Sequence, residues 1–448
     1  MEAKMNWNKL LSTKRIGRPG EAHDASEPRT EFTRDYDRII FSSAFRRLQD
    51  KTQVFPLAKS DYVRTRLTHS LEVASVGRSL GMLAAEVIAQ KQPEFRTDAL
   101  PHNIGTIVAT ACLAHDIGNP PFGHAGESAI QEWFESSRLI ERIGGAEIKD
   151  LLKFEGNAQG FRTLCKLQQA PQPGGLQLTS AVLGTFTKYP RASEVDEAQK
   201  SGISGKKFGF MQSESDLFQE LADELGLIKK SGTAAAWHRH PLAFLVEAAD
   251  DICYHVMDVE DGYKAGCVSF EEIASLHKPW LKDDHWRRGL AIEDRGRRVE
   301  YFRAVTVDAM VRAAVKAFAD NYDGLMSGSF DEELTKKMEL NQEFEAFKSL
   351  ASKKVYTAPP VVEIEACGFE VIGGLLEAFV GAINAKATNS QTGKVRTRTL
   401  LSLMPKSNVK LEQLTAYERT LLATDFVSGM TDSFAVQLYQ RIRGISLP

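Results

Sequence analysis

The adjacent residues His115 and Asp116 stand at the end of an apolar segment, residues 104–113, and Gly118 follows them. Neighbouring side chains on an α-helix point about 100° apart, so both can reach one place only near a helix end. Glycine commonly ends helices. An imidazole and a carboxylate directed together into a buried place are costly unless a partner compensates, and a metal ion is the usual partner. The sequence therefore predicts a helix that ends in a metal-binding pair.

Apolar residues recur at helical spacing through most of the chain, over residues 32–48, 68–90, 241–265, 297–318 and 415–443. Strand signals are sparse, and residues 355–364 are the best candidate for a strand. Residues 184–212 are polar and rich in Gly, Ser and Lys, which is unlike a packed element and typical of a functional or disordered loop. We therefore expect an all-α fold with minor β structure.

The size and charge of the chain exclude several classes of protein. A chain of 448 residues exceeds what one simple core usually supports, so we expect two or three subdomains. The net charge of −3 gives no global signature of binding to nucleic acid or to an anionic membrane. The five cysteines form no CxxC pair, which is typical of a reducing compartment. Because no apolar run approaches bilayer length, we expect a cytoplasmic protein with no membrane contact.

Two further polar residues occupy places where a helical core would carry apolar ones. His69 lies in the first turn of the helix predicted near Thr68, and Asp250 lies inside the apolar helix 242–252. With His115 and Asp116 they form a mixed nitrogen and oxygen set that suits Mn²⁺, Mg²⁺, Fe²⁺, Co²⁺ or Zn²⁺. Taken singly, each has a plain structural interpretation, such as a solvated helix face. The ordered set is far more specific than its members.

The order His69, His115-Asp116, Asp250 resembles the H…HD…D signature of the HD superfamily of metal-dependent phosphohydrolases. The closer resemblance is to the deoxynucleoside triphosphate triphosphohydrolases, the bacterial dGTPases and their animal relative. It rests on several separate stretches, residues 37–41, 44–48, 51–55, 66–73, 114–124, 154–159, 247–251 and 425–432. Asp251 is a possible alternative to its neighbour, but the family register favours Asp250 as the ligand.

The resemblance implies a helical fold around one divalent metal, Mg²⁺ or Mn²⁺ first, with Co²⁺, Fe²⁺, Ni²⁺ or Zn²⁺ also possible. It implies hydrolysis of a dNTP, with dGTP expected among the substrates, to deoxynucleoside and triphosphate by water attack at the α-phosphorus. It further implies a homo-oligomer, often a hexamer in relatives, and possible binding of single-stranded DNA. Within the chain it predicts an irregular arm over residues 1–30, an HD-type catalytic core over 31–265 including the loop 184–212, and a helical C-terminal region over 266–448 that completes the active site.

The family's catalytic histidine and its acidic partner fall on His124 and Glu127. His124 follows Pro-Pro-Phe-Gly in a tight loop, and Glu127 lies one helical turn further on, where it could orient the imidazole. The alternative is that His124 caps a helix that begins at Gly126. The surrounding motif favours the catalytic role.

The remaining expected contacts are with the substrate. In the family, residues at the positions of Tyr254 and Asp258 meet the sugar, and an aromatic ring beneath C2′ would exclude a 2′-hydroxyl; the alternative is a core tyrosine beside an exposed aspartate. Gln53 and Arg66 match positions that face base, sugar or phosphate, and Lys188 and Lys207 match lysines that meet phosphates. For the lysines a solvated loop is an equal alternative. Arg396 and Arg398 match the C-terminal arginines of relatives only loosely.

Two other functions stay open at this point. One is another HD phosphohydrolase, a deoxynucleotidase or an alarmone hydrolase, against which the C-terminal motif and the pair Tyr254 and Asp258 argue. The other is a nucleotide-sensing or single-stranded nucleic-acid-binding protein that keeps a structural metal site, which the overall acidity weakens. The products formed from each dNTP distinguish these possibilities.

Overall fold

The structure, a computed structural model, describes residues 4–17, 29–54, 64–138, 142–168, 173–388, 390, 393–406 and 409–445. The regular structure is helical, as predicted, and the described residues form only isolated β-bridges in place of strands. The helices are α1 (Trp7–Leu10), α2 (Glu31–Ile40), α3 (Ser43–Arg47), α4 (Arg66–Lys91), α5 (Leu100–Ala114), α6 (Gly123–Ser136), α7 (Glu147–Leu152), α8 (Gly156–Arg162), α9 (Ser180–Phe186), α10 (Ser215–Leu225), α11 (Ala243–Lys264), α12 (Phe270–His277), α13 (Asp283–Leu290), α14 (Arg295–Asp320), α15 (Tyr322–Ser327), α16 (Asn341–Lys354), α17 (Pro359–Ala387), α18 (Lys394–Leu401), α19 (Ala416–Ser428) and α20 (Asp432–Arg443).

Short 3₁₀ and π turns link several of these helices. They are η1 (Leu48–Asp50), η2 (Pro93–Phe95), η4 (Thr163–Leu167, a π turn), η5 (Glu197–Lys200), η6 (Ile203–Gly205), η7 (Gln212–Glu214), η8 (Lys278–Trp280), η9 (Leu334–Lys337) and η10 (Leu411–Gln413).

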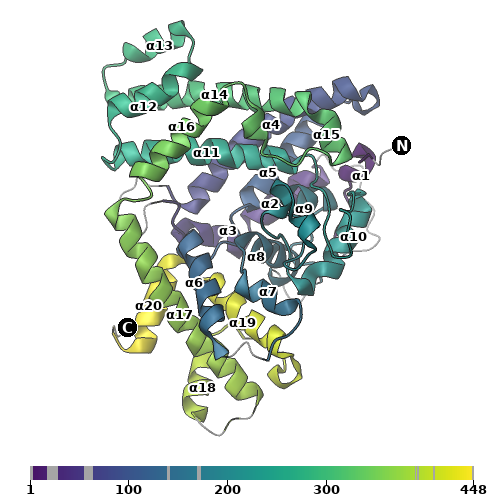
Figure 1. Ribbon diagram of the computed structural model, residues 1–448, viewed down its shortest axis with the longest axis vertical. Coiled ribbons are helices and arrows are strands. Elements are labelled where there is room, and N and C mark those ends of the chain that lie inside the picture. Colours follow the sequence, from purple (N-terminus) through teal and green to yellow (C-terminus); the bar gives the residue numbers. More distant parts are fainter. Residues whose placement is uncertain are drawn as a thin grey trace.

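Helices α4 and α5 form the most extensive helix pair, and α11 packs across both (Figure 1). Two glycines let the backbones of α4 and α5 approach: a Cβ on Gly81 would lie 2.9 Å from the Cα of Gly105. Helix α11 also contacts α14 and α16, and α14 contacts α4 as well. This packing brings the start of α4, the end of α5 and the middle of α11 to one region of the molecule.

Buried apolar side chains form two clusters. The first joins α2, α4, α5, α9, α10, α11 and α14, and the second joins α6, α7, α17, α19 and α20. In Figure 1 the helices of the second cluster occupy the lower part of the view. The division of the chain into an arm, a catalytic core and a C-terminal region stays a prediction.

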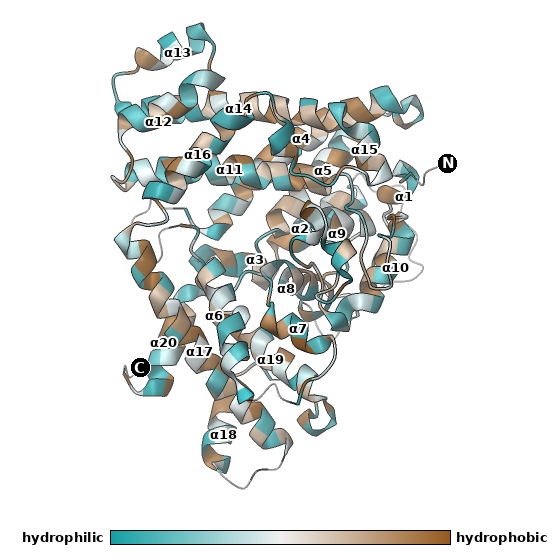
Figure 2. Cartoon of the chain, in the orientation of Figure 1, coloured by the Kyte–Doolittle hydropathy of each residue, from teal (hydrophilic) through white to brown (hydrophobic). Residues whose placement is uncertain are grey.

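Helix α17 is long and apolar enough to cross a membrane by length and composition alone, so the expectation that no run approaches that length is wrong (Figure 2). However, 56% of its apolar window is buried inside the protein. Its inward face carries Val371, Leu375 and Phe379 into the second cluster. Such burial is typical of a core helix.

Three other expectations differ from the structure. Residues 355–358 form the turn after α16 and residues 359–364 form the start of α17, because Pro359 and Pro360 suit the first turn of a helix, where no N–H partner is needed. Helix α4 begins at Arg66, with Thr65 as its N-cap in place of Thr68. Part of the polar stretch 184–212 is packed: it begins inside α9 and buries Phe208, Phe210 and Met211.

The N-terminal arm is only partly irregular where it is described. It forms α1, and the ring of Trp7 is fully buried, with its indole N–H donating to the Tyr322 hydroxyl at 2.8 Å. One aromatic residue in a polar segment gives too little periodicity to predict this anchoring.

Candidate active site

Three side chains from three helices meet at the region described above. His69 projects from the first turns of α4, His115 caps the end of α5, and Asp250 lies on α11. Their ligand atoms all lie within 4.8 Å of one another. The Asp250 Oδ1 atom is 3.2 Å from His69 Nε2 and 3.5 Å from His115 Nε2. The structure thus brings together three of the four predicted ligands as one group.

One hydrogen bond of His115 indicates that a cation suits the group formed by His69, His115 and Asp250. Its Nδ1–H donates to the carbonyl oxygen of Cys112 at 2.6 Å, so the Nε2 of the neutral ring carries a lone pair. That lone pair faces the carboxylate oxygens Asp116 Oδ2, at 3.4 Å, and Asp250 Oδ1. Asp116 Oδ2 is buried and accepts no hydrogen bond from the described residues. Nitrogen and oxygen lone pairs that converge in this way suit a divalent metal ion.

The fourth predicted ligand, Asp116, lies beside the group and is held by Arg66 and Asn119. Its Oδ1 accepts from Arg66 Nη1 at 2.8 Å and from the Asn119 amide. Burial alone would raise the pKa of Asp116, but the charge and hydrogen bond of the Arg66 guanidinium help to hold the pKa below its usual value. Asp250 behaves alike: the nearby histidines outweigh burial and hold its pKa well below the usual range. Both groups are therefore carboxylates at neutral pH.

His124 and Glu127 form a dyad at the start of α6. The His124 Nδ1–H donates to Glu127 Oε2 at 2.8 Å, and Glu127 Oε1 accepts from the Gly156 N–H at 2.7 Å. The His124 side chain is 77% exposed, whereas that of Glu127 is 8% exposed. Burial would raise the pKa of Glu127, but the hydrogen bond from His124 and the charge of Lys207 hold it below its usual value. A fixed carboxylate therefore orients an imidazole whose Nε2 is open to a reactant.

The two predicted phosphate-binding lysines point toward the same cavity and are paired with carboxylates. Lys207 lies 2.9 Å from Glu155 and 3.8 Å from Glu127, and its neighbour Lys206 is exposed. Lys188 lies 3.4 Å from Glu247. Burial raises the pKa of Glu155 to about 7, and repulsion from Glu127 adds to this. The sequence could not indicate these carboxylate partners, because each comes from a distant segment.

A cavity of about 470 Å³ unites these residues. Every predicted catalytic, metal-binding and substrate-binding residue lines it except Asp258. Its apolar walls come from both clusters: Val54, Phe186 and Val246 belong to the first, and Phe122 to the second. The residues that the sequence analysis did not predict are Thr52, Val54, Asn119, Phe122, Gly123, Asn157, Phe186, Tyr189, Val246, Glu247, Tyr356, Val361, Ile364 and Glu365.

Asp258 is covered by Tyr356 rather than exposed to the cavity. The Tyr356 hydroxyl donates to Asp258 Oδ2 at 2.7 Å, and its ring lies 5.8 Å from that of Tyr254, with an interplanar angle of 31°. Burial raises the pKa of Asp258 well above its usual value. The two tyrosines therefore form one aromatic wall, with the aspartate behind it. Tyr356 falls in the segment predicted to be a strand, which is why it was not identified.

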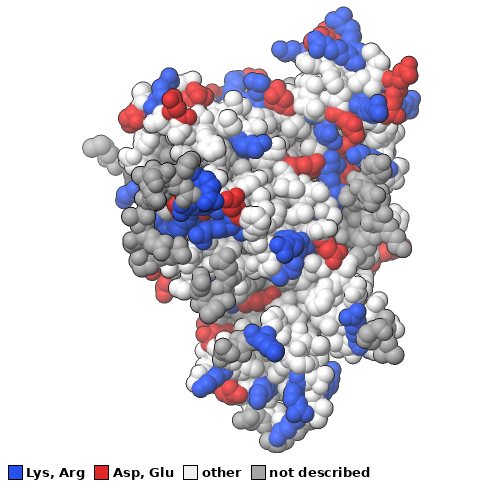
Figure 3. Space-filling view, turned by 180° about the vertical axis from the view of Figure 1, so that it is seen from behind, with Lys and Arg blue, Asp and Glu red and all other residues white. Residues whose placement is uncertain are grey.

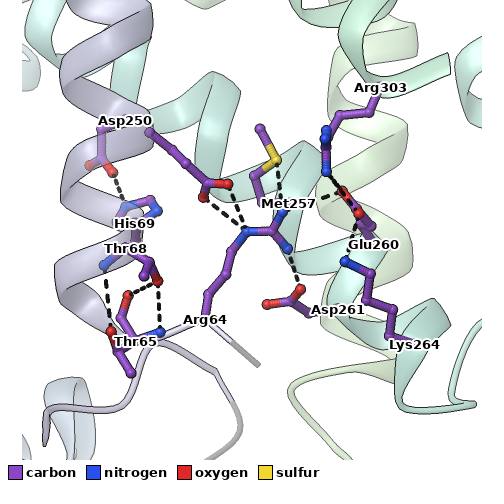
Figure 4. A network of polar contacts seen from close by, with 11 residues as sticks. Arg64, Thr65, Thr68, His69, Asp250, Met257, Glu260, Asp261, Lys264 and Arg303 are labelled. Atoms are coloured by element: carbon purple, nitrogen blue, oxygen red, sulfur yellow. Dashed lines mark hydrogen bonds and ion pairs between the residues drawn. The ribbon is translucent and has the colours of Figure 1, made fainter. Parts of the chain in front are cut away.

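A buried ion network sets the register of α4 against α11 (Figure 4). Arg64 lies just before α4 and contacts Glu72 on α4 at 2.9 Å and Glu260 and Asp261 on α11. Glu260 is also paired with Arg303 on α14 at 2.7 Å. Because His69 and Asp250 lie on the same two helices, this network holds the two predicted ligands opposite each other.

Arg396 and Arg398 lie elsewhere. Both are exposed on α18, where Lys and Arg side chains gather at the lower tip of the molecule (Figure 3). Neither lines the cavity. Binding of single-stranded DNA and assembly into a homo-oligomer stay predictions.

Comparison with known proteins agrees with this site. Residues 66–170 match the HD domain, and residues 334–441 match a phosphohydrolase-associated domain. A deoxyguanosinetriphosphate triphosphohydrolase-like protein of Synechocystis sp. is 42% identical over 452 residues, which cover 99% of this chain and 100% of the relative. The chain belongs to this family of HD phosphohydrolases.

Other members of the family match with similar coverage. A deoxyguanosinetriphosphate triphosphohydrolase-like protein of Pseudomonas aeruginosa is 38% identical over 99% of this chain and 100% of its own length. A deoxyguanosinetriphosphate triphosphohydrolase of Yersinia enterocolitica is 32% identical over 98% of this chain and 99% of its own length. The resemblance noted from the sequence is thereby confirmed for the family.

Proposed function

We propose that this HD phosphohydrolase hydrolyses dNTPs, dGTP among them, to deoxynucleoside and inorganic triphosphate. The observation that carries the proposal is that one cavity unites the His69, His115 and Asp250 group, the His124–Glu127 dyad and the cationic side chains of Arg66, Lys188 and Lys207. These are the parts that phosphoryl transfer requires: a site for a divalent ion, a proton-transfer group and positive charge for the phosphates.

A divalent ion held by His69, His115, Asp116 and Asp250 would supply a Lewis acid that withdraws charge from a phosphate oxygen. The chain's own cations would hold the rest of the triphosphate.

Lys188 and Lys207 are partly exposed toward the cavity, where each is paired with a glutamate. When triphosphate binds, each ammonium group would turn in part from its glutamate to a phosphate oxygen. Glu365 also lines the cavity, and its charge disfavours triphosphate near it. We therefore infer that the phosphates bind on the lysine side.

In the proposed reaction, the oxygen of a water molecule bonds to the α-phosphorus, and the bond from the α-phosphorus to the 5′-oxygen breaks. The water loses a proton and the departing 5′-oxygen gains one. We assign proton transfer to His124, because Glu127 occupies its Nδ1 and leaves its Nε2 for the reactant. The deoxyribose would lie against Tyr254 and Tyr356, whose rings line the cavity side by side, and a ring beneath C2′ would exclude a 2′-hydroxyl.

The purified protein, incubated with each dNTP and Mg²⁺ or Mn²⁺, tests the proposal. We expect triphosphate and a deoxynucleoside in equal amounts, with dGTP among the nucleotides consumed. Release of pyrophosphate or orthophosphate would contradict it, because either product requires a different phosphorus–oxygen bond to break.

A further inference from the structure

Asp432 connects the C-terminal part of the chain to the catalytic loop. It is the first residue of α20 and is 1% exposed. Its Oδ1 accepts from the Phe122 N–H at 3.0 Å. Its Oδ2 accepts from the Thr52 N–H at 2.9 Å and from the Thr52 hydroxyl at 2.6 Å. One carboxylate therefore ties together three segments that are far apart in the sequence.

Lys51 makes a second connection between the same three segments. Its ammonium group is buried and donates to the carbonyl oxygen of Asn119 and, at 3.1 Å, to that of Ser428. Burial lowers the pKa of Lys51 to about 7, and the charge of Asp432 opposes this. Residues 51–52, 119–122 and 428–432 are thus joined by polar contacts of two buried side chains, Lys51 and Asp432.

The loop held in this way has an unusual backbone. Phe122 has φ 63°, a left-handed value that is uncommon for a residue other than glycine, and Gly123 has φ 59°. A Cβ on Gly123 would lie 2.5 Å from Arg66 Nη2. Helix α6 begins immediately afterwards, and His124 is its second residue. Surrounding contacts must maintain such a backbone. The hydrogen bond to Asp432 is made by the N–H of Phe122 itself, the residue with the left-handed φ value.

The simpler explanation for Asp432 is that an acidic residue in a first helical turn stabilises the helix dipole. The hydrogen bonds argue against this as its whole role. Thr431 already caps α20 by accepting from the Phe434 N–H at 3.3 Å. Both oxygens of Asp432 instead accept from residues outside α20.

We propose that Asp432 is a positioning residue of the active site, which holds the loop 119–122 in the conformation that directs His124 toward the reactant. The inference rests on the proposed catalytic role of His124. Asp432 lies in the phosphohydrolase-associated domain, residues 334–441, so this domain supplies a contact to the loop that precedes His124. Asp432 itself does not line the cavity.

Asp432→Asn keeps the shape of the side chain but directs an amide N–H₂ at one of its N–H donors. We expect kcat for triphosphate release to fall at least tenfold, while KM and the Kd for Mn²⁺ stay within twofold of wild type. Asp425→Asn is the matched control, because Asp425 is a largely buried carboxylate on the preceding helix, α19, that binds Arg162 and Gln159 instead of the loop. Its kcat should stay within twofold of wild type, even though it loses stability.

Lys51→Met breaks the second connection and should also lower kcat with little change in KM, which keeps the inference testable if Asp432→Asn does not fold. The inference is overturned if Asp432→Asn has wild-type kcat, or if Asp425→Asn loses as much kcat at the same folded fraction. An inactive wild-type protein would contradict the proposed function instead, so the two failures are distinguishable.

Discussion

At the scale of single residues, the site depends on which atom of each imidazole is free. The Cys112 carbonyl occupies Nδ1 of His115, and Glu127 occupies Nδ1 of His124. Each ring thus presents Nε2, one to the group that suits a metal ion and one to the open cavity. We therefore propose different roles for these two histidines, because, of the pair, only His115 faces carboxylates with its free nitrogen.

His124→Ala tests this division of roles. We expect the variant to lose triphosphate release by about 10²- to 10⁴-fold, the usual contribution of a proton-transfer group, while it binds Mn²⁺ as wild type does. Steady-state kinetics and isothermal titration calorimetry measure the two effects. His102→Ala is the control, because His102 is exposed on α5 and does not line the cavity. Loss of metal binding in His124→Ala would instead identify His124 as a ligand.

The sequence predicted the positions of site residues that lie in motifs. It did not predict contacts between residues that are far apart in the chain. His69, His115 and Asp250 meet as the ordered motif predicted, because helical spacing limits where each side chain can point. The environment of Asp258 was not predictable, since Tyr356, which covers it, lies about a hundred residues further along the chain. The same holds for Lys207, whose partner Glu155 comes from a separate loop.

At the scale of elements, Arg64 joins the helices that carry two of the proposed metal ligands. Its side chain is 9% exposed, and it neutralises carboxylates on α4 and α11 (Figure 4). Removing one partner of a buried ion pair leaves an uncompensated charge, which is strongly destabilising. The network therefore contributes both to folding and to the distance between His69 and Asp250.

Arg64→Ala should lower the free energy of unfolding by about 3–5 kcal/mol, measured by urea denaturation, and should weaken Mn²⁺ binding. Arg312→Ala is the control, because Arg312 and its partner Asp308 are 68% and 64% exposed. Its effect should stay below about 1 kcal/mol, as is usual for a surface pair. Equal stability of the two variants would show that the Arg64 network does not hold α4 against α11.

Helices could be predicted where apolar residues repeat at helical spacing over several turns. The prediction was wrong where the apolar run was short. The helix expected over 241–265 is α11, whose apolar residues repeat over several turns. In place of the strand expected over 355–364, the chain forms a turn and then the start of α17, because a short apolar run does not distinguish strand from helix. Pro359 and Pro360 were the available signal, since they suit a helix start.

At the scale of the whole molecule, the cavity lies where the two apolar clusters meet. Buried carboxyl groups that do not line the cavity make the stability of the fold depend on pH. Asp150 is fully buried beneath Tyr417, and burial raises its pKa from 3.8 to about 6. Between these values the unfolded chain releases the proton and the folded chain keeps it. Stability supplied by this group is therefore present below pH 4 and is lost as the pH rises toward 6.

Asp150→Asn removes this titration and keeps an acceptor for the Gln212 N–H and the Tyr417 hydroxyl. Relative to wild type, the variant should gain about 2–3 kcal/mol of unfolding free energy between pH 4 and pH 7, measured by urea denaturation at each pH. Asp98→Asn, at an exposed position, should show no such gain. An equal pH dependence in Asp150→Asn and wild type would contradict the raised pKa.

The most direct test of the proposed reaction is to determine the products formed from dGTP in ¹⁸O-labelled water, with Mn²⁺ or Mg²⁺ present. Water attack at the α-phosphorus with loss of the 5′-oxygen predicts deoxyguanosine without label and triphosphate that carries one ¹⁸O atom. Formation of dGMP, or label in deoxyguanosine, would contradict the account, because either result requires a different bond to break.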